Sequence, residues 1–197
     1  LAGAGRGSLA YGAGVRDERT MALLVALAKA TGARLLGWSE GANLRGVADM
    51  GLLPDRLPGH AVLADAATRA QWGRTWRATL PDQAGLAASE LWAAVERGQV
   101  RAVYLAACDP LSDAPDPGAV ARALKAAEFV VVQDCFLTPT AAVADVVLPA
   151  AAPFEEDGSM TNLAGMVGWQ QAVVAPLGEA RAHWRILAEV ARSLDER

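Results

Sequence analysis

The stretch from Val100 to Gln133, VRAVYLAACDPLSDAPDPGAVARALKAAEFVVVQ, decides the fold of this chain. It begins with one apolar run, Val100 to Ala107, and ends with a second, Phe129 to Gln133. Between them, Gly118 to Glu128 has the apolar spacing of an amphipathic helix. Two short apolar strands joined through one helix predict parallel pairing with a right-handed crossover. We therefore expect the strands at Val100 and Phe129 to be parallel neighbours in a sheet that is covered on both faces.

The sequence around this unit continues the α/β pattern in both directions. On the C-terminal side, Thr138 to Ala144 predicts a short helix, Asp145 to Leu148 a third strand, and Ala180 to Leu194 an amphipathic helix. On the N-terminal side, further patterns predict two helices, Asp17 to Thr31 and Ser89 to Arg97, and one strand, Arg34 to Trp38. The predicted fold class is therefore α/β, a Rossmann-like parallel sheet with helices on both faces.

Three segments lack a sustained hydrophobic periodicity of the kind that indicates a helix or a strand. Residues 1–15 are rich in Gly and Ala, residues 39–73 form an irregular excursion, and residues 154–175 predict an extended segment with a hairpin. Irregular segments of this length are usually functional or lie at an interface, although a plain surface excursion is the alternative. We expect one domain, with residues 1–150 as its α/β part and residues 151–197 as an extended segment and C-terminal helix. Because the first residue is Leu1, we expect the chain to be part of a longer protein.

The composition argues against several classes of protein. Of the 197 residues, 53% are hydrophobic and 20% charged, which argues against a disordered chain. The net charge of −4 argues against a nucleic-acid partner, because phosphate binding requires a basic face. No apolar run reaches the roughly 18 residues of a membrane-spanning helix, and no secretory signal is visible, so we expect a cytoplasmic protein. Two cysteines, Cys108 and Cys135, are too few for a disulfide scaffold, a tetrahedral metal site or a four-cysteine iron–sulfur cluster.

Polar residues follow the two strands that decide the fold. Asp109 comes soon after the first strand, and Gln133 and Asp134 stand at the end of the second. Ligands of open parallel sheets bind beyond the carboxyl ends of the strands, where these side chains would share one edge. Carboxylate and amide groups there can hydrogen-bond to the ribose or base of a nucleotide. The alternative is that they only cap the turns that follow.

Other polar residues carry weaker signals. Cys108 and Cys135 follow buried strands, where packing is favoured over a redox role. The run of Glu155, Glu156 and Asp157 favours a solvated turn over acid–base chemistry, and His60 and His183 favour capping over metal binding. The residues by themselves therefore identify no catalytic residue and no metal site.

A longer stretch carries a family resemblance. Residues 130–167, VVVQDCFLTPTAAVADVVLPAAAPFEEDGSMTNLAGMV, resemble a signature region of the molybdopterin oxidoreductase superfamily. That region typically reads V-x-Q/S-D-x-F-x-T-x-T-A-x-x-A-D-V-V-L-P and then E-x-x-G-T-x-x-N-x-E-G-R. VYLAACDP resembles the family's strand followed by G-x-N-P, and PLGEARAHWRILAEVARSL resembles its P-x-G-E-A-R-x-D-W-x-I-L helix. The matching signature residues are Gln133, Asp134, Thr138, Thr140, Ala141, Ala144, Asp145, Leu148, Pro149, Glu155, Gly158 and Asn162.

This resemblance implies a place in the large domain of formate dehydrogenase-like enzymes. Relatives that bind molybdopterin–guanine dinucleotide contact it near the positions matching Asp109, Gln133 and Asp134. The chain departs from the family's G-x-N-P and E-G-R motifs. Ala107 and Asp109 stand in place of the glycine and asparagine, and Ala164 and Met166 stand in place of the carboxylate and arginine. An alanine restricts close backbone approach to a phosphate, and a lost arginine removes a charged donor. The resemblance therefore implies an inherited pocket that is vestigial.

One segment narrows the resemblance to a single group within the superfamily. NLRGVADMGLLPDRLPGH, Asn43 to His60, is similar to the family of G subunits of bacterial NADH–quinone oxidoreductase, or complex I. This implies a piece of a peripheral-arm protein whose N-terminal part carries the iron–sulfur clusters. It implies other peripheral-arm subunits as partners, a place on the cytoplasmic face of the inner membrane, and a role in electron transfer from NADH to quinone. The alternatives are a fragment of a genuine molybdopterin-dependent oxidoreductase, such as a formate dehydrogenase-like enzyme, and a structural assembly module without a ligand.

Overall fold

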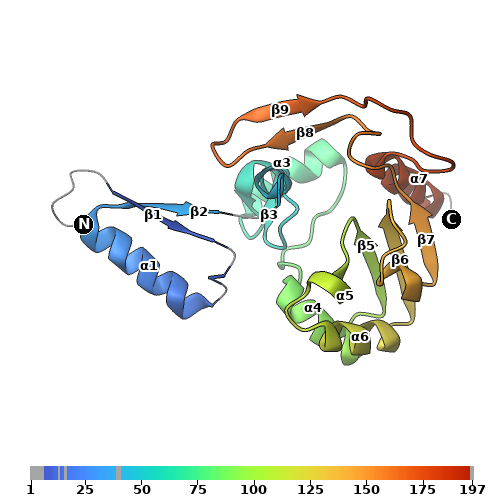
Figure 1. The fold of residues 1–197 in the computed structure, drawn as a ribbon, viewed down its shortest axis with the longest axis horizontal. Helices are drawn as coiled ribbons and strands as arrows, with labels where there is room; N and C mark the ends of the chain where they lie inside the picture. Colours follow the sequence, from blue (N-terminus) through green and yellow to red (C-terminus); the bar gives the residue numbers. More distant parts are fainter. Residues whose placement is uncertain (1–6, 13, 16, 39–40, 196–197) are drawn as a thin grey trace.

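The computed structural model describes residues 7–12, 14, 15, 17–38 and 41–195. Leu1 lies outside these ranges. Figure 1 shows a small N-terminal unit, built from β1, α1 and β2, beside a larger part that holds the remaining elements. In the part of the chain that is described, no helix is both long enough and apolar enough to cross a membrane.

The larger part is built on a parallel sheet of three strands in the order β5–β6–β7. These strands are β5 (Ala102–Ala106), β6 (Phe129–Asp134) and β7 (Val146–Pro149), and both pairs are parallel. The helix α6 (Pro117–Ala126) makes the crossover from β5 to β6. The predicted parallel pairing of the first two strands is therefore confirmed.

The apolar core lies on one face of this sheet. Side chains alternate along each strand, so every second residue of β5 and β6 points toward α6 and toward α4 (Ala88–Glu96). The buried core consists of Val95, Val103, Leu105, Val120, Ala123, Leu124, Val130, Val132 and Ala141. Each buried Val or Leu contributes about 1.5–3 kcal/mol through removal of its surface from water.

The opposite face of the sheet carries Tyr104, Val131 and Gln133. The C-terminal helix α7 (His183–Asp195) begins beside this face, where its first residue hydrogen-bonds to Gln133. The α/β class with a parallel sheet is confirmed. Among the described residues, helical cover of this second face is limited to the start of α7, since Tyr104 is 38% exposed and Phe129 46% exposed.

The excursion that we predicted to be irregular is largely regular, so that prediction was wrong. It contains α2 (Leu44–Asp49), β3 (Arg56–Leu57), η1 (Pro58–His60), β4 (Ala61–Val62) and most of α3 (Ala66–Trp76). The elements before α3 are too short to show a hydrophobic periodicity in the sequence. The start of α3 is set by Asp65, whose carboxylate accepts the backbone N–H of Thr68 at 3.0 Å. The connection between β5 and its crossover helix also holds a helical turn, α5 (Pro110–Asp113).

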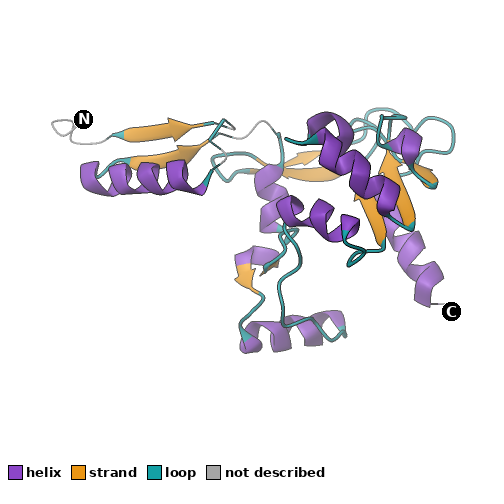
Figure 2. Ribbon diagram, turned by 90° about the horizontal axis from the view of Figure 1, so that it is seen from below, coloured by secondary structure: helices purple, strands orange, loops and turns teal. Residues whose placement is uncertain are grey.

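The N-terminal unit is a β–α–β step. The strands β1 (Ser8–Tyr11) and β2 (Arg34–Gly37) are parallel, and α1 (Glu18–Thr31) connects them. Asp17 caps α1 by accepting the backbone N–H of Thr20 at 2.8 Å. The opening, which we expected to lack regular structure, therefore contains a strand. Figure 2 shows that this unit projects from the rest of the chain.

The predicted hairpin is confirmed as β8 (Gly158–Thr161) paired antiparallel with β9 (Val167–Gln170). Asn43 fixes the other edge of β8, because its side-chain oxygen accepts the Thr161 N–H at 2.8 Å and its amide nitrogen donates to the Ser159 carbonyl at 3.3 Å. Arg45 adds a second contact, because its guanidinium donates to the Leu163 carbonyl at 3.2 Å, and the two side chains together hold the excursion against the hairpin. The short helix η2 (Ala141–Val143) completes the elements before β7.

Candidate functional site

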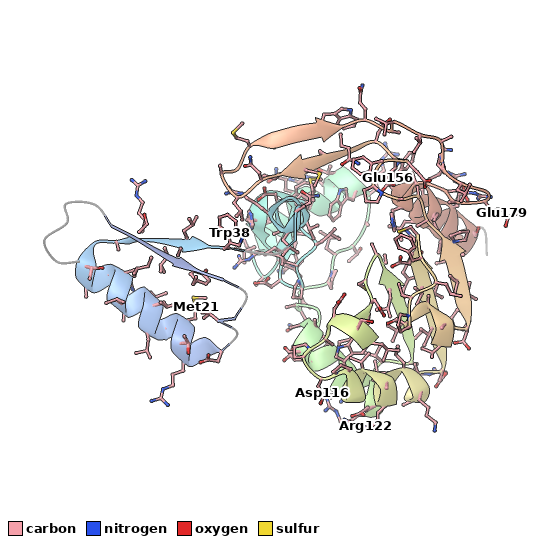
Figure 3. The ribbon with its side chains drawn as sticks, in the orientation of Figure 1. Met21, Trp38, Asp116, Arg122, Glu156 and Glu179 are labelled. Atoms are coloured by element: carbon pink, nitrogen blue, oxygen red, sulfur yellow. The ribbon has the colours of Figure 1, made fainter. Side chains whose placement is uncertain are left out.

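A cavity of about 390 Å³ lies beyond the carboxyl ends of β5 and β6, against the β8–β9 hairpin. Glu156 reaches into the space between this hairpin and α7 (Figure 3). The lining residues come from five parts of the chain: Asn43, Ala107, Asp134, Cys135, Ala151, Pro153, Glu156, Gly158, Ser159, Met160, Gln170 and His183. The cavity therefore has the location that the sheet topology predicts for a ligand site.

Of the three predicted site residues, Asp134 lines this cavity. One of its carboxylate oxygens accepts the backbone N–H of Phe136 at 3.0 Å, which fixes the turn after β6. The side chain is half-buried, so its second oxygen remains able to accept a hydrogen bond from a ligand.

Gln133 is fully buried and lies under the cavity. Its Oε1 accepts the hydroxyl proton of Tyr104 at 2.5 Å. Its Nε2 lies 2.6 Å from Nδ1 of His183 and 3.2 Å from the carbonyl oxygen of the same residue. Every polar atom of the Gln133 side chain is thus paired within the protein, so this residue supports the cavity floor.

The same contacts determine the tautomer of His183. A carbonyl oxygen only accepts hydrogen bonds, so the amide group facing the His183 carbonyl must be the NH₂ of Gln133. That NH₂ also donates to Nδ1, which leaves the proton of a neutral imidazole on Nε2. Among the described residues, Nε2 has no hydrogen-bond partner. No buried side-chain nitrogen or oxygen of these residues lacks a partner, so Nε2 is accessible rather than buried. His183 therefore offers an accessible N–H donor at the cavity.

Asp109 does not line the cavity. Its carboxylate accepts the Thr140 N–H at 3.0 Å, the Thr140 hydroxyl, and the Ser112 hydroxyl at 2.5 Å. Desolvation opposes its ionisation, but the hydrogen bonds from Ser112 and Thr140 outweigh this effect and hold the pKa of Asp109 below its ordinary value. Asp109 thus ties the turn after β5 to the buried Thr140. Its carboxylate accepts no backbone N–H of the helical turn that follows it, so the capping alternative does not describe this residue.

Ala107 and Cys135 lie on one side of the cavity. Ala107 has φ of +52°, a left-handed conformation that favours glycine, and its Cβ occupies space that glycine would leave open. Desolvation, and then the negative charge of Asp134, raise the pKa of both Cys108 and Cys135. Both thiols therefore stay protonated at neutral pH. Cys108 is exposed and Cys135 is half-buried, so the prediction that both cysteines pack in the interior was wrong.

The acidic run is more ordered than the predicted solvated turn. Glu155 accepts the Ala152 N–H at 2.9 Å, and Asp157 accepts the Ala172 N–H at 2.8 Å. Glu156 accepts the N–H of His183, the first residue of α7, at 2.8 Å. A carboxylate at this place also complements the positive end of the helix dipole. The three carboxylates thus fix backbone segments around the cavity.

Three cavity residues were missed by sequence reasoning as site residues: Asn43, Glu156 and His183. Asn43 lies in the segment that carries the complex I resemblance, and His183 stands where the quoted family helix has Asp. These two features of the sequence could have identified Asn43 and His183 as site residues. Glu156 gave none, because nothing in the sequence indicates that the start of α7 returns to this position.

The chemistry of the cavity is acidic. Asp134 and Glu156 bring carboxylates, His183 brings an imidazole, Asn43 brings an amide, and none of the lining residues is Lys or Arg. Such a site is suited to cations or to groups rich in N–H donors. It is poorly suited to a phosphate, which calls for basic side chains or free backbone N–H groups.

The comparisons with known proteins agree with this architecture. The sequence model of the family described as molybdopterin oxidoreductase matches residues 11–193. The NADH-quinone oxidoreductase G subunit 2 of Rhizobium meliloti is 41% identical over 76% of the chain and 18% of its own length. Formate dehydrogenase H of Escherichia coli is 38% identical over 76% of the chain and 21% of its own length. The alpha subunit of NADPH-Fe(3+) oxidoreductase of Geobacter sulfurreducens is 37% identical over 77% of the chain and 17% of its own length.

A solved structure shows the same fold. Acetylene hydratase from Pelobacter acetylenicus matches 76% of this chain and 19% of its own chain, with a TM-score of 0.51 and 24% identity. The chain therefore spans about a fifth of the length of these relatives. With a family match over nearly its whole length, the chain belongs to the molybdopterin oxidoreductase family.

Proposed function

We propose that this chain is part of the peripheral-arm G subunit of a respiratory NADH–quinone oxidoreductase. The observation that carries the proposal is the 41% identity to such a G subunit over 76% of the chain. A second support is Asn43, because the segment with the complex I resemblance supplies this cavity residue and the contacts that hold β8.

In this proposal the pocket inherited from the family is vestigial. The pterin–guanine dinucleotide of the family carries a pyrophosphate, and the residues of this cavity do not fit it. Ala107 places a Cβ where the family has glycine, Asp134 and Glu156 repel phosphate, and the lining has no basic side chain. Gln133 supports the cavity from below and leaves no free polar atom for a ligand.

The proposed role of the chain is therefore structural. With two free cysteines, the chain cannot hold a four-cysteine cluster, so electrons pass from NADH to quinone through clusters elsewhere in the complete protein. The large apolar side chains exposed around the hairpin, Val167 and Trp169 among them, suit packing against the rest of the polypeptide and other peripheral-arm subunits. That assembly would lie on the cytoplasmic face of the inner membrane.

A formate dehydrogenase-like enzyme is the second candidate, favoured by the 38% identity to formate dehydrogenase H. In that case the cofactor pocket would be occupied, with basic residues supplied from elsewhere in the protein. A third candidate is an assembly module that has no ligand.

Affinity purification of the native protein through a C-terminal tag tests the proposal. We expect it to co-purify with other subunits in an assembly that oxidises NADH and reduces a water-soluble quinone. Formate oxidation without NADH oxidation would support the second candidate, and a partner assembly without either activity would support the third.

A further inference from the structure

The start of α7 is held on the sheet by a small number of hydrogen bonds. Ile186 is the one residue of α7 that the described structure buries. Glu156, which reaches toward α7 in Figure 3, accepts the His183 N–H at 2.8 Å. The NH₂ of Gln133 donates to the His183 carbonyl at 3.2 Å and lies 2.6 Å from its Nδ1. A segment with so few buried apolar residues opens locally at a low free-energy cost, so these contacts decide whether the first turn stays docked.

The contact with Nδ1 requires a neutral imidazole. The NH₂ of Gln133 can only donate, so Nδ1 of His183 must offer a lone pair. The buried amide is held in this orientation at both ends. If it turned over, its oxygen would face the His183 carbonyl oxygen and the Tyr104 hydroxyl would lose its acceptor. A proton on Nδ1 would therefore point at another donor 2.6 Å away.

The titratable groups that surround the imidazole act in the opposite direction. Asp134 and Glu156 line the same cavity as His183 and attract a protonated imidazole, whereas the Cys135 thiol there is uncharged. In the described structure, neither carboxylate is hydrogen-bonded to the imidazole, and both are only half-buried. Their attraction thus acts over a longer range and through a partly hydrated space. The direct conflict between two donors outweighs it.

The charges on α7 itself are already paired. Glu189 forms an ion pair with Arg181, just before the helix. The guanidinium of Arg185 lies over the Trp184 ring, 5.6 Å from its centroid. These groups therefore leave the contact between Gln133 and His183 as the part of the helix start that responds to a proton.

We propose that His183 is a pH-sensitive switch for the docking of α7. While its imidazole is neutral, Gln133 holds the first turn of α7 on the sheet. When the imidazole takes up a proton, this contact is lost, the first turn detaches, and the cavity opens on the side of His183. Histidine changes its charge between pH 5 and 8, so the switch responds to mild acidification. The proposal goes beyond the proposed function and holds equally for a formate dehydrogenase-like protein.

Hydrogen exchange of the complete polypeptide, measured by mass spectrometry at pH 7.5 and pH 5.5, tests this directly. After correction for the intrinsic effect of pH on exchange, we expect the peptide containing Ile186 to exchange at least about tenfold faster at pH 5.5. The peptide containing Val120 is the internal control, because this residue is fully buried on the opposite face of the sheet. An unchanged rate at Ile186, or an equal acceleration at Val120, would overturn the proposal.

His183→Asn is the matched variant. The side-chain oxygen of asparagine can replace Nδ1 as an acceptor for Gln133, but it does not titrate. We expect wild-type protection of Ile186 at pH 7.5 and a change of less than about twofold at pH 5.5. His60→Asn alters the other histidine of the chain and should retain the full acceleration. Acceleration that persists in His183→Asn, or that disappears in His60→Asn, would contradict the switch.

Tyr104→Phe gives a second readout that leaves His183 in place. Phenylalanine cannot donate to Oε1 of Gln133, so one of the two contacts that hold the amide is removed. The amide can then turn more easily and accept the proton on Nδ1. We expect a smaller acceleration at Ile186 than in the wild type. An acceleration as large as in the wild type would show that the orientation of Gln133 does not sense the proton, and would overturn the proposal.

Discussion

The side-chain nitrogen of Gln133 lies 2.6 Å from Nδ1 of His183, and this contact joins the central strand β6 to the first residue of α7. The two residues are 50 positions apart in the sequence. The same glutamine is fully buried and accepts the Tyr104 hydroxyl proton, so one side chain connects β5, β6 and α7 beneath the cavity. Stability and the shape of the cavity therefore depend on the same residue.

Replacement of Gln133 with leucine is expected to destabilise the protein by about 2–4 kcal/mol. Leucine has a similar size but leaves Tyr104 and His183 without partners, and an unpaired buried polar group costs about 1–3 kcal/mol. Urea denaturation of the variant measures the change in the free energy of unfolding. The matched control is Gln171→Leu at an exposed position, which should change it by less than about 0.5 kcal/mol. An equal effect of both variants would contradict the role assigned to Gln133.

The hydrogen bonds to Asp109 predict a loss of stability in acid. Because its pKa is lowered in the folded state, this carboxylate stabilises the protein above its unfolded value of 3.8. That contribution is lost as the pH falls through the lower folded pKa, when the carboxylate takes up a proton. Melting temperatures between pH 6 and pH 2.5 should therefore fall less steeply for Asp109→Asn than for the wild type. Parallel curves for the two proteins would show that Asp109 is not the group responsible.

Gly46→Ala is expected to release the hairpin from the excursion. A Cβ on Gly46 would lie 2.1 Å from Oδ1 of Asn43, the atom that accepts the Thr161 N–H. Asn43 would have to move, so exchange of the β8 amides should accelerate and stability should fall by about 1–3 kcal/mol. Gly12→Ala is the control, since nothing lies within 4 Å of an added Cβ there. Unchanged exchange in β8 would show that Asn43 does not hold this strand.

Ala107→Gly is expected to stabilise the protein. Alanine at φ of +52° has a left-handed conformation that costs about 1–2 kcal/mol, and glycine avoids this cost at the expense of some entropy in the unfolded chain. The net gain should be about 0.5–1 kcal/mol in thermal or urea unfolding. Ala106→Gly, one residue earlier in β5, should destabilise instead, because glycine weakens a strand. A loss of stability in Ala107→Gly would contradict the strain inferred at this position.

The sequence predicts the central sheet well and the N-terminal part less well. The runs around Val103 and Val130 are continuous and apolar, and every second residue is buried against α4 and α6, so the strands and their pairing could be predicted. Ser8 to Tyr11 gives no such signal, because β1 is short and none of its residues is buried within this chain. The helix α3 was missed for a related reason, since none of its residues is buried and no apolar stripe develops along it.

The candidate site, too, could be predicted only in part from the sequence. Topology was enough to place Asp134 at the carboxyl edge of the sheet. It could not show that Gln133 and Asp109 direct their polar atoms to protein partners, because those partners, His183 and Thr140, lie 50 and 31 residues away. The contact with His183 depends on how α7 returns to the sheet, and the contact with Thr140 depends on how the turn after β6 lies against the turn after β5. No local pattern in the sequence encodes either arrangement.

The proposed loss of the family's cofactor from this cavity is tested most directly by one measurement. The complete protein, purified in its native assembly, should be analysed for molybdenum and tungsten by mass spectrometry and for released pterin by fluorescence. We expect much less than one metal atom per chain and no stoichiometric pterin. One molybdenum or tungsten atom per chain together with a released pterin would contradict the vestigial pocket and favour a cofactor-dependent, formate dehydrogenase-like enzyme.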